Sequence, residues 1–132
     1  MTTPALDLFS TYVHLGGQGT AATLPLTPDF WRRLSVDKSD RVVGAKHARD
    51  ADDLHPNEQE MHPHGDELLL LLSGALDVIL ELPEGERTVP LKAGGACVVP
   101  RGVWHRLSLR QPSDLVFVTP PDGTQVRPTP GR

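Results

Sequence analysis

Short runs of apolar residues, separated by turns rich in glycine and proline, occupy the middle of this chain. Apolar and polar residues alternate over residues 76–82 and again over 89–92, which is the period-two pattern of strands with one buried face. Residues 83–86 between them have the composition of a hairpin turn. Residues 11–15 and 41–48 are weaker strand candidates. The pattern therefore predicts several short strands joined by tight turns.

Residues 68–72 are five consecutive leucines and show no alternation, so we expect a strand that is covered on both faces, followed by a turn at Ser73–Gly74. From His105 the alternation is clear, and it places His105 on the side of the leucines that follow it, which is the inner side. Residues 114–119 are expected to be the last strand. Strands of this length and spacing are typical of a closed or double-sheet all-β fold.

The two ends of the chain read differently from the middle. Residues 27–34 predict a short helix, with Thr27 as its cap and Pro28 at its first position. We expect this helix to close one end of a barrel, and a substrate-contacting lid is the alternative. Residues 49–57 predict a polar loop in which His55 is solvated, whereas His47 just before it could face either way. The proline-rich tail, residues 121–132, is expected to be extended and partly disordered.

Length and composition limit the class of protein. A chain of 132 residues fits one domain, and its 12 glycines and 13 prolines fall between the apolar runs as turn residues. The net charge is −4 and the basic residues are scattered, so we expect no nucleic-acid partner. No apolar run approaches the length of a membrane span, and the start of the chain does not resemble a signal peptide. With a single cysteine, Cys97, we expect a cytoplasmic protein without an internal disulfide.

Potential metal ligands gather between residues 60 and 67, where Glu60, His62, His64 and Glu67 follow one another closely. Pro63 and Gly65 favour a tight connection after His62, so that Glu67 begins the next strand. Imidazole and carboxylate groups together suit iron, manganese, nickel or zinc. Such groups inside an apolar barrel need a cation, because an unpaired buried carboxylate is costly.

These residues resemble the motifs of the cupins, which are small double-stranded β-helix, or jelly-roll, barrels. The second cupin motif is matched in spacing by Gly94, Pro100, Gly102 and His105, with Leu109 in the place of its final asparagine. The end of the first motif is matched by Glu67 and Gly74. The glycine that begins the first motif is absent. The resemblance covers residues 40–120.

The beginning of the first motif can be aligned in two ways. If His62 and His64 are its histidine pair, they lie one residue too close to Glu67. If His62 is the second histidine, four residues separate it from Glu67, as in the family, and Glu60 takes the first ligand position. We prefer this second alignment. It implies the ligand set Glu60, His62, Glu67 and His105, with His64 as an extra or substitute ligand.

The resemblance implies a cupin barrel over residues 40–120, with residues 1–39 packed on it as a strand and a short helix. It implies a small-molecule substrate in the barrel, a divalent transition metal (Fe, Mn, Ni or Zn), and chemistry like that of cupin dioxygenases or isomerases. A non-enzymatic module that binds or senses a small molecule without a catalytic metal is the alternative. The resemblance also implies a homodimer.

Overall fold

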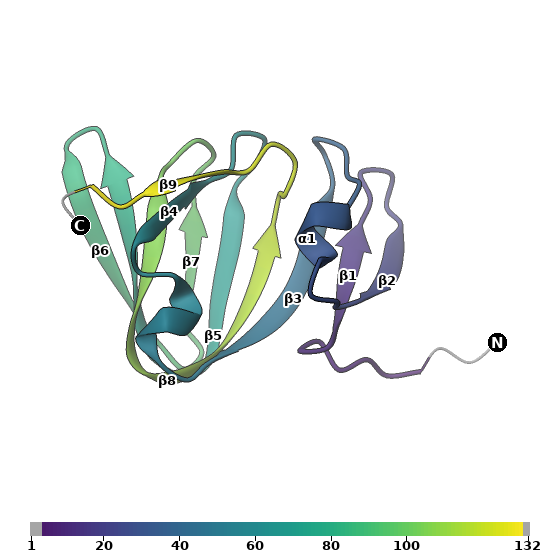
Figure 1. The fold of residues 1–132 in the computed structure, drawn as a ribbon, viewed down its shortest axis with the longest axis horizontal. Helices are drawn as coiled ribbons and strands as arrows, with labels where there is room; N and C mark the ends of the chain where they lie inside the picture. The colour runs from purple at the N-terminus through teal and green to yellow at the C-terminus, as the bar shows by residue number, and fades with distance from the viewer. Residues whose placement is uncertain (1–3, 131–132) are drawn as a thin grey trace.

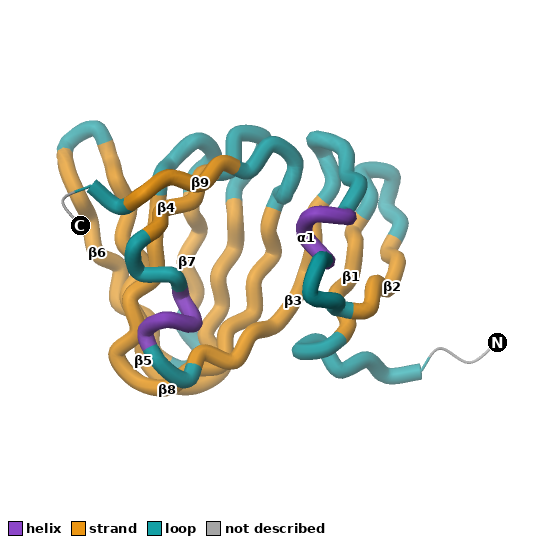
Figure 2. The backbone as a smooth tube through the Cα atoms, viewed as in Figure 1, coloured by secondary structure: helices purple, strands orange, loops and turns teal. Residues whose placement is uncertain are grey.

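A sheet of nine strands that folds over on itself forms most of the protein (Figure 1). The computed structural model describes residues 4–130. Helical structure in this range is confined to two single-turn segments, which are purple in Figure 2. The elements are β1 Thr11–Leu15, β2 Ala21–Pro25, α1 Phe30–Arg33, β3 Arg41–Ala48, the 3₁₀ turn η1 Ala51–Leu54, β4 Glu58–Met61, β5 Glu67–Leu82, β6 Gly85–Lys92, β7 Ala96–Val99, β8 His105–Thr119 and β9 Gln125–Pro128. The expected all-β jelly-roll barrel with a short N-terminal helix is confirmed.

Two long strands connect the parts of this sheet. Strand β5 pairs with β6, β7 and β8, and β8 also pairs with β3 and β4. Strands β1 and β2 continue the sheet beyond β3. In Figure 1, β4 and β9 cross in front of one part of the sheet, and α1 lies in front of β1 and β3. The interior is therefore bounded by the curved sheet behind and by β4, β9 and α1 in front.

The turn expected at Ser73–Gly74 is wrong, because β5 continues through it. Gly74 has a φ of +88°, and the pairing of β5 with β8 is irregular on both sides of Ser73. A Cβ at Gly74 would lie 2.3 Å from the Pro112 carbonyl oxygen, so the backbones approach more closely than any side chain allows. This β-bulge joins two predicted strands into one of 16 residues. Residues 114–119 are likewise the second half of β8 and not a separate strand.

The expectation that residues 68–72 are covered on both faces is also wrong. Leu69 and Leu71 are buried, whereas Leu68 and Leu72 are 39% and 49% exposed. Leu68 pairs with Val98 of β7 and with Val118 of β8, and the row continues through Val43 to Val13. We call these five residues, Val13, Val43, Leu68, Val98 and Val118, the outer stripe. It runs over five adjacent strands on the face opposite the buried leucines.

The N-terminal helix is shorter than predicted. It spans four residues, Phe30–Arg33, with Asp29 at the N-cap position and no side-chain cap, and Thr27 instead donates a hydrogen bond to Asp29 Oδ1. Phe30 is buried against Tyr12, with their rings edge to face at 5.2 Å. Aromatic packing on β1, more than the helix itself, therefore holds this segment in place.

The expectation of a partly disordered tail is wrong for the residues that the structure describes. Strand β9 pairs with β4 at four positions, and the Thr129 amide donates to the Asn57 carbonyl. Gly131 and Arg132 lie outside the described residues. Among residues 4–130, no helix has the length and apolar character needed to cross a membrane.

Candidate metal centre

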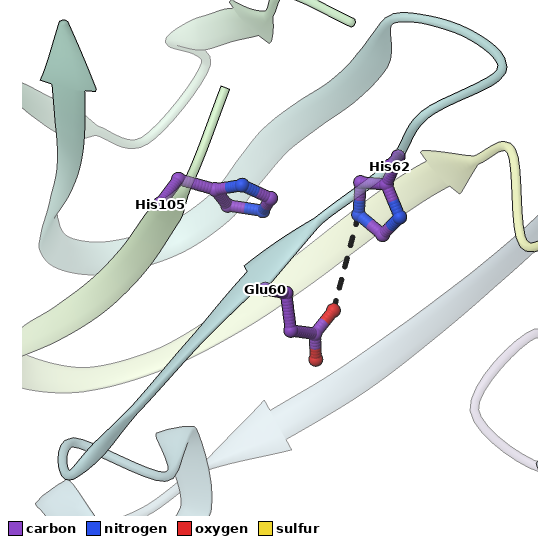
Figure 3. Close-up of side chains that lie close together, drawn as sticks. All are labelled: Glu60, His62 and His105. Atoms are coloured by element: carbon purple, nitrogen blue, oxygen red, sulfur yellow. Dashed lines mark ion pairs between the residues drawn. The ribbon is translucent and has the colours of Figure 1, made fainter. Parts of the chain in front are cut away.

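Four side chains from three separate parts of the chain meet at one end of the barrel interior. Glu60 comes from β4, His62 directly follows that strand, Glu67 is the first residue of β5, and His105 is the first residue of β8. The register pairs Glu60 with His105 across β4 and β8. Figure 3 shows the Glu60 carboxylate and the two imidazole rings turned toward a common space.

The ligand atoms of these residues lie close to one another. One ligand atom from each of Glu60, His62 and His105 lies within 4.8 Å of the corresponding atoms of the other two. Glu67 lies between the imidazoles, with Oε1 3.1 Å from His105 Nε2 and Oε2 3.4 Å from His62 Nε2. Glu60 Oε2 is 3.8 Å from His62 Nε2. Both Nε2 atoms therefore face carboxylate oxygens across a shared space.

Two tight turns fix the imidazoles in this position. The Gly102 amide donates a hydrogen bond of 2.9 Å to the His62 carbonyl, which joins the turn before His105 to the turn after β4. Gly102 has a φ of +80°, a conformation that favours glycine. The Val103 carbonyl lies 3.1 Å from His105 Nδ1 and can only accept, so Nδ1 carries a proton and Nε2 faces the site.

The charges of the centre depend on one another. His62, Glu67 and His105 are all buried, whereas the Glu60 side chain is about half exposed, at 52%. Burial by itself raises the pKa of the Glu67 carboxyl, but the imidazoles of His105 and His62 outweigh it and lower this pKa to about 2. Burial by itself lowers the pKa of His105, and its hydrogen bond with Glu67 more than reverses this, so the pKa is raised. Without a metal, Glu67 and His105 therefore form a buried ion pair at pH values below the pKa of His105.

The donor atoms fit a divalent transition metal. The Nε2 atom of His62 is buried and has no hydrogen-bond partner, although a buried imidazole nitrogen normally has one. Its other nitrogen, Nδ1, is 2.8 Å from Thr124 Oγ1. Two imidazole nitrogens and two carboxylates are a mixed set that iron, manganese, nickel and zinc accept, and the partly exposed Glu60 side leaves room for water or substrate.

The other histidines make their polar contacts with other residues, although His47 and His55 also line the cavity that adjoins the centre. His64 Nε2 is 3.5 Å from Asp122 Oδ2, so its ring turns to the C-terminal segment and away from the other four. His47 is 2.6 Å from Asp114 Oδ1 and stacks on Phe9 near the surface. His55 is exposed, as expected, and ends η1 in a left-handed conformation. The geometry therefore favours the alignment that begins at Glu60 over the one that uses His64.

A cavity of about 870 Å³ adjoins the four side chains. All four line it, and the rest of its wall is largely apolar. Part of this wall comes from the N-terminal segment, where Tyr12 of β1 and Trp31 of α1 pack on Phe117 of β8 with ring centroids 5.3 to 6.0 Å apart. The other apolar wall residues include Leu26, Leu34, Val36, Leu69, Leu107 and Leu115.

Residues 52–120 match the family model of the cupin domain, Cupin_2. The chain therefore belongs to the cupin domain family. A comparison with curated protein sequences found no match.

The solved structures to which this chain is similar share little sequence with it. One is a cupin-2 domain containing protein from Shewanella frigidimarina, with 17% identity, 66% of this chain and 74% of that chain covered, and a TM-score of 0.48. A second is hydroquinone 1,2-dioxygenase from Sphingomonas sp. TTNP3 with 4-hydroxybenzoate bound, which is 19% identical. The match covers 58% of this chain and 57% of that chain, with a TM-score of 0.46. The Fe(II) form of HppE has 21% identity, covers 60% and 41%, and has a TM-score of 0.45.

Thr124 and the meeting of Tyr12 with Phe117 escaped the sequence analysis, whereas Trp31 lies in the helix for which a substrate-contacting lid was the alternative, and it does line the cavity. Thr124, beside His62, follows a proline-rich stretch with no strand pattern, and only the apolar Val126 among polar neighbours hinted at a strand. Tyr12, Trp31 and Phe117 are far apart in the sequence, so their meeting at the cavity depends on how the sheet pairs. Neither Thr124 nor the pair Tyr12 and Phe117 has a local signal that links it to the metal ligands.

Proposed function

We propose that this protein is a metal-dependent enzyme that acts on a small organic molecule inside the barrel, with dioxygenase-like or isomerase-like chemistry. Glu60, His62, Glu67 and His105 hold a divalent metal, which is Fe, Mn, Ni or Zn. The observation that supports this best is the convergence of both buried Nε2 atoms on Glu67, with that of His62 left without a hydrogen bond. Bound there, the metal supplies a Lewis acid for substrate oxygen atoms or a site for O₂.

The residues of the chain divide the remaining tasks. Glu60 is the exposed carboxylate of the set and lines the cavity, so it is the group best placed to take a proton from a bound molecule at its carboxylate oxygen. The apolar wall fits a substrate with a hydrocarbon or aromatic body and its polar group toward Glu60 and the imidazoles. His62 and His105 stay buried and fix the direction from which the polar group approaches.

Metal content is the test of this proposal. We expect untagged protein to contain near-stoichiometric metal by inductively coupled plasma mass spectrometry, and to convert members of a small-molecule panel in O₂-uptake or isomerisation assays. If the protein takes up none of Fe(II), Mn(II), Ni(II) or Zn(II) on dialysis, the proposal is wrong. Metal uptake or ligand binding without turnover of any panel member would favour the binding or sensing module.

We also propose that the protein is a homodimer that buries the outer stripe. The five apolar side chains lie in register across five strands, with Leu68 and Val98 39% and 57% exposed and the three other valines partly exposed, so a monomer leaves part of this row in water. Because the stripe carries no charge, a second copy can pack on it across a two-fold axis without burying an unpaired ion.

Adding charge to the outer stripe is expected to separate the subunits. The double variant Leu68→Asp and Val98→Asp should have the molar mass of a monomer in light scattering coupled to size-exclusion chromatography, whereas the wild type has that of a dimer. Thr88→Asp, on the exposed face of β6, is the control and should stay dimeric. A monomeric wild type at micromolar concentration would rule out this interface.

The single cysteine is consistent with action in the cytoplasm, which we propose as the location. Cys97 is buried and free, and burial raises the pKa of its thiol. A protonated, buried thiol is a poor nucleophile. Cys97 is therefore a packing residue that tolerates a reducing compartment.

A further inference from the structure

The C-terminal segment after Pro120 lies beyond the matched cupin region and crosses the strand that carries the metal ligands. Strand β4 pairs with β8 only through Glu60 and His105, but it pairs with β9 at four positions. Figure 1 shows β9 running along β4 in front of the sheet. Most of the backbone pairing of β4 therefore comes from this segment.

Arg127 anchors the segment next to His105. Its guanidinium lies over the Trp104 ring, 4.1 Å from the centroid, and its Nε donates a 2.8 Å hydrogen bond to Gln59 Oε1. Gln59 is fully buried and donates in turn to Glu81 Oε1 at 3.1 Å. Trp104 is therefore covered by the C-terminal segment of its own chain. The segment is thus built into the fold beside two ligand-bearing elements.

Thr124 provides the contact between this segment and the metal centre. Its Oγ1 lies 2.8 Å from His62 Nδ1, while His62 Nε2 lies 3.4 Å from Glu67 Oε2 and has no hydrogen bond. The Thr124 hydroxyl can accept a hydrogen bond from Nδ1 or donate one to it, so the contact holds the imidazole ring in either tautomer. A ring held in this way keeps Nε2 directed at the space that Glu67 and His105 share.

We propose that Thr124 is a positioning residue that holds the His62 ring in the orientation in which Nε2 can bind the metal. The inference rests on the proposed function, because His62 is taken there as a ligand. Partners of this kind commonly change metal affinity by about 10 to 100-fold. Thr124 is exposed, so water can partly replace its hydroxyl, and we expect the lower end of that range.

The test compares Thr124→Val, which removes the hydroxyl at nearly constant shape, with Thr124→Ser, which keeps it. In metal-free protein, nuclear Overhauser contacts of the His62 ring protons should report the same single ring orientation in the wild type and in Thr124→Ser. In Thr124→Val they should report more than one ring orientation. Zn(II) affinity, measured by competition with a chelator, should fall about 10-fold in Thr124→Val and stay within about 3-fold of wild type in Thr124→Ser.

Thr88→Val, on exposed β6, is the matched control and should change neither readout. The inference is overturned if Thr124→Val leaves the orientation of the His62 ring unchanged. It is also overturned if Thr124→Ser behaves like Thr124→Val. Should the wild type bind no metal, the proposed function fails, and the ring orientation in the metal-free protein still decides the role of Thr124.

Discussion

Replacement of His105 by glutamine is expected to reduce metal affinity by roughly 100-fold or more. Loss of a ligand costs at least as much affinity as loss of a hydrogen-bond partner of a ligand. Glutamine keeps a donor for Glu67, so the variant avoids the unpaired buried carboxylate that alanine would leave. His62→Gln should have a similar effect. Metal bound after dialysis, measured by inductively coupled plasma mass spectrometry, and titration with Zn(II) provide the measurement.

The same measurement decides between Glu60 and His64. Glu60→Gln is expected to lower the metal affinity by about 10-fold or more, because the Glu60 carboxylate is a direct ligand in the proposed set, although a partly exposed one. His64→Gln is the matched control and should bind as the wild type does, since its ring pairs with Asp122. Loss of metal in His64→Gln with full binding in Glu60→Gln would contradict the proposed set and support the other alignment.

The stability of the metal-free protein is expected to fall in acid because of Glu67. Its pKa is lowered from 4.5 to about 2 in the folded protein, so its contribution is fully present above pH 4.5 and disappears as the pH falls toward 2. At about 1.4 kcal/mol per pH unit, this change is of the order of 3 kcal/mol in the free energy of unfolding. Urea unfolding of chelator-treated protein across this range measures it.

Other carboxylates also contribute to the acid response, so the relevant quantity is the difference between variants. Asp40, Asp53 and Asp114 have lowered pKa values and are common to all variants. Glu67→Gln should lack the acid loss assigned to Glu67, and Glu86→Gln, on exposed β6, should retain it. Equal acid slopes in wild type and Glu67→Gln would show that Glu67 is not held ionised by the histidines.

His105 should produce the opposite dependence on the alkaline side. Its raised pKa means that its contribution is fully present below 6.5, the ordinary value, and is lost as the pH rises through the folded pKa. The Glu67–His105 pair is one interaction, so the two contributions are not added. The metal-free protein is therefore expected to gain most from this pair between about pH 4.5 and 6.5.

Most strands could be predicted from the sequence because period-two alternation reports one buried face. Residues 11–15 and 41–48 were predicted with the bounds that β1 and β3 have. The errors occur where the sequence shows no alternation of apolar and polar residues. Five leucines in a row do not reveal which of them face outward, and a serine and a glycine in sequence read as a turn even where a bulge keeps the strand paired.

The sequence by itself limited the candidate ligands to Glu60, His62, His64, Glu67 and His105, because the resemblance to the cupin motifs rests on the spacing of residues within two short stretches. Only the tertiary structure decided that His64 turns to Asp122 and that Thr124 reaches His62. The pairing of β4 with β9 and the aromatic wall were likewise decided there. These contacts join residues tens of positions apart, and their geometry depends on how the strands pair, which no short stretch of sequence encodes.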